Sequence, residues 1–389
     1  MNNKVTGAGA VTIQASGGLS TASPISGQSV TLTTTAGSAG SISLGGPVNS
    51  TGAVTVKSDG NITTSSTVSG TDITLMNTGS SGSLNIGATL TGTGEVVLIA
   101  MGNLSTSSTV SGDSLYLATS AGTSGSITVG GTLKALSAAV SLESDNNIVT
   151  NGSISGNNIG IRNNGPSGST TIGGTISASG TVLVEAKGNL SINSNVTANA
   201  GIDLNTFANG NILIGGTLSG GAGLVNIVST NSIITSGNIS SGSAVLMHNL
   251  GSSGSITIGG SISATMLVDM NSKGVLTINS PVTAGAAASF EAQGNLNVNA
   301  AISSNYVLLQ TTSGSNGNIA LGANVTVSDA FPGFYGIEVK ADGVGSITQS
   351  TGILSTSSTP ILLSSVSGGI GNVSNSIAFN APAVQASTT

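Results

Sequence analysis

The sequence predicts an all-β fold: a right-handed single-stranded parallel β-helix, or β-solenoid, of about 16 coils with about 21 residues per coil. Three observations predict it. A block of about 21 residues recurs along the chain, apolar residues alternate within each block, and Gly and Asn gather between the alternating runs. A repeat of this length is typical of solenoids, whose coils bury their apolar faces only against neighbouring coils. Right-handed winding follows from the handedness of parallel crossovers.

The alternation predicts three short strands in each coil. A period of two directs one face of each strand into the core, and β-branched residues favour strands over helices. Strands of successive coils should pair in parallel about 4.8 Å apart, which predicts a rod on the order of 80 Å long. In the block that begins at Gly125, the predicted inward residues are Ile127, Val129, Leu133, Val140 and Leu142.

Two kinds of block alternate, so the deeper period is about 42 to 44 residues. One kind reads GNITTSSTVSG from Gly60, and the other reads GSITVGGTL from Gly125. Turns are expected where Gly and Asn gather, because these residues tolerate the positive φ of sharp corners. The clearest predicted turns are Gly102-Asn103, Gly130-Gly131 and Gly188-Asn189.

The residue after the turn glycine is Asn in one kind of block and Ser in the other. We expect a stacked polar ladder at this corner, in which each side chain satisfies backbone groups or its vertical neighbour. The alternative is a row of ligand-binding amides. The ladder residues are Asn61, Asn103, Asn147, Asn189 and Asn295 in one kind, and Ser41, Ser83, Ser126, Ser169 and Ser255 in the other.

Glutamates recur at one position of the coil, and polysaccharide-cleaving β-helix enzymes use such acids. Alternation from the inward Leu142 makes this column solvent-facing, and acids two coils apart lie about 10 Å from each other. Glycosidases need carboxyls within about 5 to 9.5 Å, one of them in a perturbed environment. We therefore expect the column to keep the surface soluble and not to catalyse. Its members are Glu143, Glu185 and Glu291, with Lys57 in an earlier coil.

A threonine column could indicate ice binding if it faced outward. Alternation points these threonines inward, which disfavours that function. They are Thr21, Thr64, Thr106, Thr150 and Thr235.

The only histidine, His248, is expected at a turn, because LMHNLGSSGS aligns with LMNTGSSGS around Asn77. One histidine without an acidic partner at fixed spacing makes neither a metal site nor a triad. No calcium-binding or phosphate-loop motif occurs. The sequence therefore predicts no catalytic residue, no metal site and no cofactor.

Charge and composition exclude some classes of partner. Only 20 of the 389 residues are charged (7 Lys and Arg, 13 Asp and Glu), whereas about a quarter is usual in soluble domains. Seven basic residues and a net charge of -6 leave no patch for nucleic acid. No run reaches the roughly 18 apolar residues of a transmembrane segment. The absence of Cys is compatible with cytosol or with export.

The repeat pattern begins with the first residues of the sequence, and no segment that would cap the first coil is evident. We therefore expect either a segment of a longer protein or a subunit whose end is covered by another copy.

Three regions are expected along the chain: regular coils over 1–328, an aromatic loop inserted over 329–336, and less regular coils with a tail over 337–389. Loops inserted into solenoid coils are common recognition sites. The loop could contact a ligand or partner, or it could pack against the rod. Its candidate contact residues are Phe331, Phe334 and Tyr335.

Blocks such as GNLSTSSTVSGDSLYLATSAGTSGSITVGGTL, from Gly102, resemble the repeat region of filamentous-haemagglutinin-type exoproteins and related autotransporter adhesins of Gram-negative bacteria. The likeness is one of repeat style and covers nearly the whole chain. The asparagine-proline motifs of the secretion domain of such exoproteins are missing. The resemblance implies an extracellular or cell-surface rod, exported by a Gram-negative-type route.

Three functions are compatible with these features. The first is a non-enzymatic structural rod, stalk or adhesin segment, with a surface receptor or glycan of a host or neighbouring cell as its partner. The second is a filament subunit that stacks end to end, since open coil ends template strand addition. The third is a polysaccharide-binding or polysaccharide-cleaving module.

Overall fold

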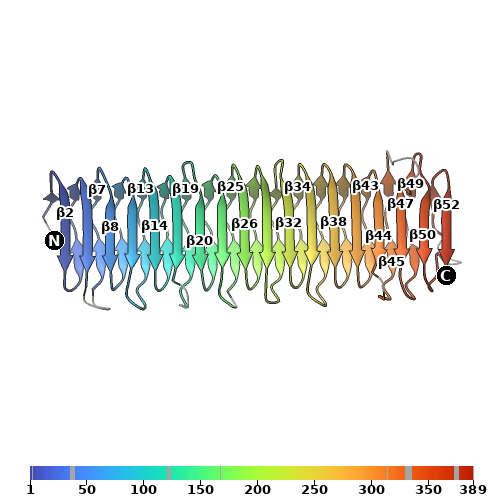
Figure 1. The fold of residues 1–389 in the computed structure, drawn as a ribbon, viewed down its shortest axis with the longest axis horizontal. Coiled ribbons are helices and arrows are strands. Elements are labelled where there is room, and N and C mark those ends of the chain that lie inside the picture. Colours follow the sequence, from blue (N-terminus) through green and yellow to red (C-terminus); the bar gives the residue numbers. More distant parts are fainter. Residues whose placement is uncertain are drawn as a thin grey trace. The chain divides into compact units, whose positions relative to one another are not determined.

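The computed structural model describes residues 1, 3–35, 40–120, 124–166, 168–312, 314–328, 335–371 and 376–388. Among these residues every regular element is a strand, and no helix suited to crossing a membrane occurs. The chain divides into two compact units, Met1–Asn195 and Val196–Thr389. Each unit is a β-solenoid of three parallel sheets (Figure 1). The two together make about 17 turns of about 22 residues, which confirms the predicted fold class; the right-handed winding stays a prediction.

In the first unit each coil contributes one strand to each of three sheets. Sheet A contains β1 (Val5–Thr6), β4 (Ile25–Gly27), β7 (Val48–Ser50), β10 (Val68–Gly70), β13 (Leu90–Gly92), β16 (Val110–Gly112), β19 (Leu133–Ala135), β22 (Ile154–Gly156) and β25 (Ile176–Ala178). Sheet B contains β2 (Ala10–Ala15), β5 (Ser29–Thr34), β8 (Val54–Ser58), β11 (Ile73–Asn77), β14 (Glu95–Ala100), β17 (Ser114–Thr119), β20 (Val140–Ser144), β23 (Ile159–Asn163) and β26 (Thr181–Ala186). Sheet C contains β3 (Leu19–Thr21), β6 (Ile42–Leu44), β9 (Ile62–Thr64), β12 (Leu84–Ile86), β15 (Leu104–Thr106), β18 (Ile127–Val129), β21 (Ile148–Thr150), β24 (Thr170–Ile172) and β27 (Leu190–Ile192).

The second unit repeats the arrangement. Its part of sheet A contains β28 (Val196–Ala198), β31 (Leu218–Ser219), β34 (Ile239–Ser241), β37 (Ile262–Ala264), β40 (Val282–Ala284), β43 (Ile302–Ser304), β46 (Val325–Val327), β49 (Leu354–Thr356) and β51 (Phe379–Asn380). Its part of sheet B contains β29 (Gly201–Thr206), β32 (Leu224–Ser229), β35 (Ala244–Asn249), β38 (Leu267–Ser272), β41 (Ala287–Ala292), β44 (Val307–Thr311), β47 (Ile337–Ala341), β50 (Ile361–Ser365) and β52 (Val384–Thr388). Its part of sheet C contains β30 (Ile212–Ile214), β33 (Ile233–Thr235), β36 (Ile256–Ile258), β39 (Leu276–Ile278), β42 (Leu296–Val298), β45 (Ile319–Leu321) and β48 (Ile347–Gln349).

The core consists of aliphatic side chains stacked coil over coil. Ile127 pairs in register with Leu104 on one side and Ile148 on the other, and all three are fully buried. Burial of each such side chain contributes about 1.5 to 3 kcal/mol before conformational entropy is subtracted. The five inward residues predicted for the block from Gly125 are all buried, which confirms the prediction.

The threonine column also faces inward as predicted, and its hydroxyls lack partners. Thr106 is 2 % exposed, and its register neighbours are Ile86 and Val129. Aliphatic neighbours cannot accept a hydrogen bond, so among the described residues the Thr106 hydroxyl has no partner. The same holds for the hydroxyls of Thr21, Thr64, Thr150 and Thr235.

We expect Thr106→Val to stabilise the first unit by about 1 kcal/mol, because it removes a buried hydroxyl without a hydrogen bond and preserves the branched shape. Chemical denaturation of the parent and the variant measures the change. Thr63→Val on the outer face of β9, where Thr63 is half-buried, is the control and should leave the free energy of unfolding within about 0.5 kcal/mol. A destabilised Thr106→Val variant would show that the hydroxyl has a partner.

The polar ladder forms at the corner between sheets B and C. The backbone N–H of Ser83 donates to Oδ1 of Asn61 at 2.8 Å, and that of Ser126 donates to Oδ1 of Asn103 at 2.9 Å. Asn147 accepts from Ser169 in the same way at 2.9 Å. The asparagines therefore satisfy backbone donors of the next coil, as expected for a structural ladder.

At the three predicted turns, a positive φ does not explain the glycines. None of the glycines at the three predicted turns has a positive φ, and neither has Asn103 or Asn189. At Gly131 an added Cβ would lie 2.0 Å from the carbonyl oxygen of Ser108 in the neighbouring coil. Glycine is required there because the backbones of successive coils approach too closely for a side chain.

The two kinds of block differ in the turn that follows sheet B. Short turns over 59–61, 101–103 and 145–147 alternate with longer ones such as 78–83. A buried polar side chain often closes the strand before the turn: Ser144 donates to the carbonyl of Gly125 at 2.9 Å, and Thr119 donates to it at 3.2 Å. This inward polar column was not predicted, although Ser, Thr or Asn recurs at the position.

Candidate functional site

The outer face of sheet B differs chemically from the other two outer faces. Among the described residues, charged side chains are absent from the strands of sheet C, and Lys134 is the one on sheet A. Sheet B carries ten of the 20 charged residues of the chain. These are Lys57, Glu95, Glu143, Arg162, Glu185, Asp203, Asp269, Glu291, Glu338 and Lys340. Any chemistry on the surface of the strands is therefore concentrated on sheet B.

Most of these carboxylates are bound by a donor from a neighbouring coil. The contacts are Tyr116 Oη to Glu143 Oε2 at 3.1 Å, Arg162 Nε to Glu185 Oε2 at 3.0 Å, Asn226 Nδ2 to Asp203 Oδ1 at 2.9 Å, His248 Nε2 to Asp269 Oδ2 at 2.9 Å, Asn271 Nδ2 to Glu291 Oε2 at 3.0 Å, and Tyr306 Oη to Glu338 Oε1 at 3.1 Å. Such pairs on a surface contribute about 0.2 to 1 kcal/mol each. They tie successive coils together along the face.

The glutamate column lies on the outer face, as its alternation predicted, and Lys57 is exposed there as well. The sequence did not reveal that Glu143, Glu185 and Glu291 have partners, because the donors come from coils 20 to 27 residues away. Engagement with Tyr, Arg and Asn gives these carboxylates a structural role between coils.

The predicted position of His248 is wrong. His248 lies on β35 and faces outward, and Asn249, buried to 1 % exposure, occupies the place of Asn77. The correct alignment matches the shared GSSGS and moves the histidine back by one residue. His248 also has the acidic partner that the sequence did not suggest, since Asp269 lies beside it in the next coil.

No group of three or more His, Cys, Asp or Glu that could hold a metal ion occurs in the part of the chain that the structure describes. The His248–Asp269 pair is therefore a two-residue contact between coils. Its register neighbours on the same face include Val228 and Leu246, which supply neither a nucleophile nor a ligand.

Tyr306, which precedes β44, interacts with Glu338 on this face. Burial and the negative charge and hydrogen bond of Glu338 raise the pKa of Tyr306 from 10.0 to about 12. Lys340 forms an ion pair with the same carboxylate. Because the folded state holds the phenol proton more tightly than the unfolded chain, the stability from this proton is present below pH 10 and is lost as the pH rises through about 12.

We therefore expect Tyr306 to ionise well after a free phenol when the alkaline titration is followed by phenolate absorbance. Tyr306→Phe should remove the transition near pH 12 and flatten the alkaline fall in stability. Glu338→Gln should lower the pKa only in part, since burial is the largest cause. A Tyr306→Phe titration that matched the parent would contradict this assignment.

The predicted aromatic loop is described only at its end. Phe331 and Phe334 lie outside the described residues. Tyr335 donates its hydroxyl to Oε1 of Gln385 on β52. At this residue the contact is within the chain and favours the packing alternative.

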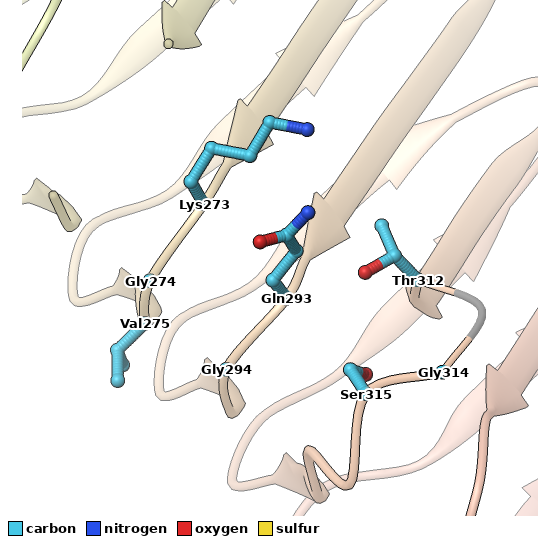
Figure 2. Close-up of a pocket in the computed structure, with 8 residues that line it drawn as sticks. All are labelled: Lys273, Gly274, Val275, Gln293, Gly294, Thr312, Gly314 and Ser315. Carbon is cyan, nitrogen blue, oxygen red and sulfur yellow. The ribbon is translucent and has the colours of Figure 1, made fainter. Parts of the chain in front are cut away.

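Two hollows open at the turns after sheet B, one in each unit. The second unit has one of about 450 Å³. In Figure 2, Lys273 and Gln293 extend from neighbouring strand ends, while glycine backbone forms much of the remaining wall. The first unit has one of about 440 Å³ over the short turn at Gly102 and Asn103, lined by Ser and Gly of the longer turns. Among the described residues that line these two hollows, none has an aromatic ring or a carboxylate.

A third hollow, of about 290 Å³, lies on the outer face of sheet B in the first unit. It combines apolar, aromatic and acidic groups: Ile99, Ala118, Tyr116, Glu143 and Asp145. Burial, together with the nearby Glu143, raises the pKa of Tyr116 above its ordinary value. The sequence did not predict this hollow, because the residues that line it come from different coils.

No family model matches the chain, and neither a curated protein nor a solved structure matches it. The register of the three sheets and the chemistry of their outer faces are therefore the basis for functional assignment.

Proposed function

We propose that this chain is a non-enzymatic structural segment of an extracellular stalk or adhesin. The observation that carries the proposal is the unbroken register of three parallel sheets within each unit, with the same inward and outward columns from coil to coil. Backbone pairing along the stacking direction and a continuous apolar core resist bending. The repeat style shared with secreted adhesins adds the extracellular location.

The outer surface supports the same function. Hydroxyl side chains occupy successive coils on sheet A, as in Ser219, Ser240, Ser263 and Thr283. Small neutral groups of this kind keep a surface soluble at low charge, and the paired carboxylates of sheet B tie coils together. Both features suit a spacer.

Electron microscopy of the purified chain over a concentration series tests the proposal. A stalk predicts uniform rods on the order of 80 Å long at every concentration. Short, compact or flexible particles would contradict it.

End-to-end stacking is the second candidate, and one observation favours it. Phe379 is 52 % exposed, whereas its register partner Leu354 is fully buried. A further coil, from the same polypeptide or from a second copy, would cover the ring. Fibres that lengthen with concentration would support stacking of copies, and uniform rods would refute it.

A further inference from the structure

We propose that the hollow beside Tyr116 binds an organic cation: an ammonium or guanidinium group on a short apolar stem. Its volume of about 290 Å³ suits one amino-acid side chain or a small amine. The inference does not rest on the stalk function, because it concerns a local site on the face of one unit.

The hollow exists because a small residue lies between two larger ones. β17 directs Tyr116 and Ala118 outward, and Ala118 pairs in register with Ile99 on one side and Glu143 on the other. The methyl group of Ala118 leaves room that the longer neighbours enclose. Although it faces outward, Ala118 is only 6 % exposed, so it forms a floor and not an open surface.

The polar groups at the hollow select for positive charge. The Tyr116 hydroxyl fixes the Glu143 carboxylate at 3.1 Å, and Asp145 adds a second carboxylate from the following turn. Among the described residues that line it, none is Lys or Arg. Partial burial strengthens the attraction between these carboxylates and a cation relative to bulk water.

The arginine in register with Glu143 is paired with a different carboxylate. Arg162 lies one coil beyond Glu143 in register and binds Glu185 through Nε at 3.0 Å. Among the described residues that line the hollow, the charged ones are Glu143 and Asp145, both acidic, and the Arg162–Glu185 pair beyond them adds no net charge, so the net charge is -2. An anionic ligand would be repelled.

The apolar groups at the hollow favour a ligand whose positive charge is carried on an apolar stem. Ile99, Ala118 and the ring of Tyr116 provide contact area for methylene groups, and an aromatic face also attracts cations. A bare metal ion would gain nothing from this floor, and the described residues hold no cluster of three metal-binding side chains. A lysine-type or arginine-type side chain uses both halves of the site.

Isothermal titration calorimetry with Nα-acetyl-lysine methylamide tests the proposal on the full chain. We expect binding that weakens as salt is raised, and no binding of the neutral Nε-acetylated probe. Cadaverine, a free diamine, provides the second arm: tighter binding of cadaverine indicates a free amine as the ligand, and tighter binding of the blocked lysine indicates a side chain of a partner.

Two variants locate the site. Glu143→Gln keeps an acceptor for Tyr116 but removes the charge, and it should weaken binding at least about tenfold. Ala118→Leu should fill the hollow and abolish binding. The controls are Glu291→Gln in the same column of the second unit and Ala320→Leu on the outer face of sheet C, and both should bind as the parent does.

Equal binding of the neutral probe, or parental affinity of Glu143→Gln, would overturn the proposal. Since Ala118→Leu could disturb β17, its melting curve is recorded first, and the Glu143→Gln result decides the outcome if that variant does not fold. Loss of binding in either control variant would likewise place the site elsewhere.

Discussion

Ile127→Asp is expected to destabilise the first unit by more than about 5 kcal/mol. Loss of the aliphatic side chain alone costs about 2 to 5 kcal/mol in a packed core. Ile127 is fully buried between Leu104 and Ile148, so the new carboxylate has no partner and no water. Burial of an unpaired charge adds several kcal/mol unless the group is neutralised.

The loss should spread over neighbouring coils only, because each coil contacts its immediate neighbours. Circular dichroism during thermal unfolding measures it, with an early transition expected in the variant. Thr128→Asp is the matched control: Thr128 is the next residue of β18 and is exposed on the outer face. That variant should unfold within about 0.5 kcal/mol of the parent. Equal melting of Ile127→Asp and the parent would contradict the inward assignment.

The inward columns could be predicted because they depend on local alternation alone. Ile127 and Val129 flank a polar residue on one strand, and a period of two decides their face without reference to any other coil. The fold class follows once the same pattern recurs at a fixed spacing. The predicted number of about 16 coils lies close to the about 17 turns of the structure.

The contacts on sheet B could not be predicted in the same way. The pair of Tyr116 and Glu143 depends on the register between β17 and β20, and turn lengths set that register. If the alignment of two coils is wrong by one residue, the contacting residues are not recognised. The alignment of His248 with Asn77 was wrong by one residue, so the sequence did not indicate Asp269 as the partner of His248.

The hollow beside Tyr116 could not be predicted from the sequence either. Nothing in the local sequence SLYLATS marks Ala118 as special, since alanine is common on exposed strands. Its importance comes from Ile99 and Glu143, which lie in the coils before and after it. A functional site on the face of a solenoid is formed by residues of successive coils. These residues can be identified only when the register between the coils is known.

Gly152→Ala is expected to destabilise the first unit by about 2 kcal/mol or more. Gly152 lies in the turn between β21 and β22, where its N–H donates to the carbonyl of Val129 at 3.0 Å. An added Cβ would lie 1.8 Å from the carbonyl oxygen of Gly131 and 2.5 Å from its carbon. Both atoms belong to the backbone of Gly131, whose own N–H donates to the carbonyl of Thr106 at 3.1 Å, so relief requires coils to separate at this corner. Overpacking of this kind costs about 1 to 3 kcal/mol or more.

Loss of glycine also makes the unfolded chain less flexible, which favours folding by about 0.4 to 1 kcal/mol and offsets part of the cost. Gly160→Ala separates the two effects. Gly160 lies on β23 of the same unit, and a Cβ there meets nothing within 4 Å. That control should be neutral or slightly stabilised, while Gly152→Ala melts early in the same denaturation experiment. If both variants matched the parent, close backbone approach would not explain why glycine occupies this corner, and the spacing of the coils at the turns would be wider than the structure shows.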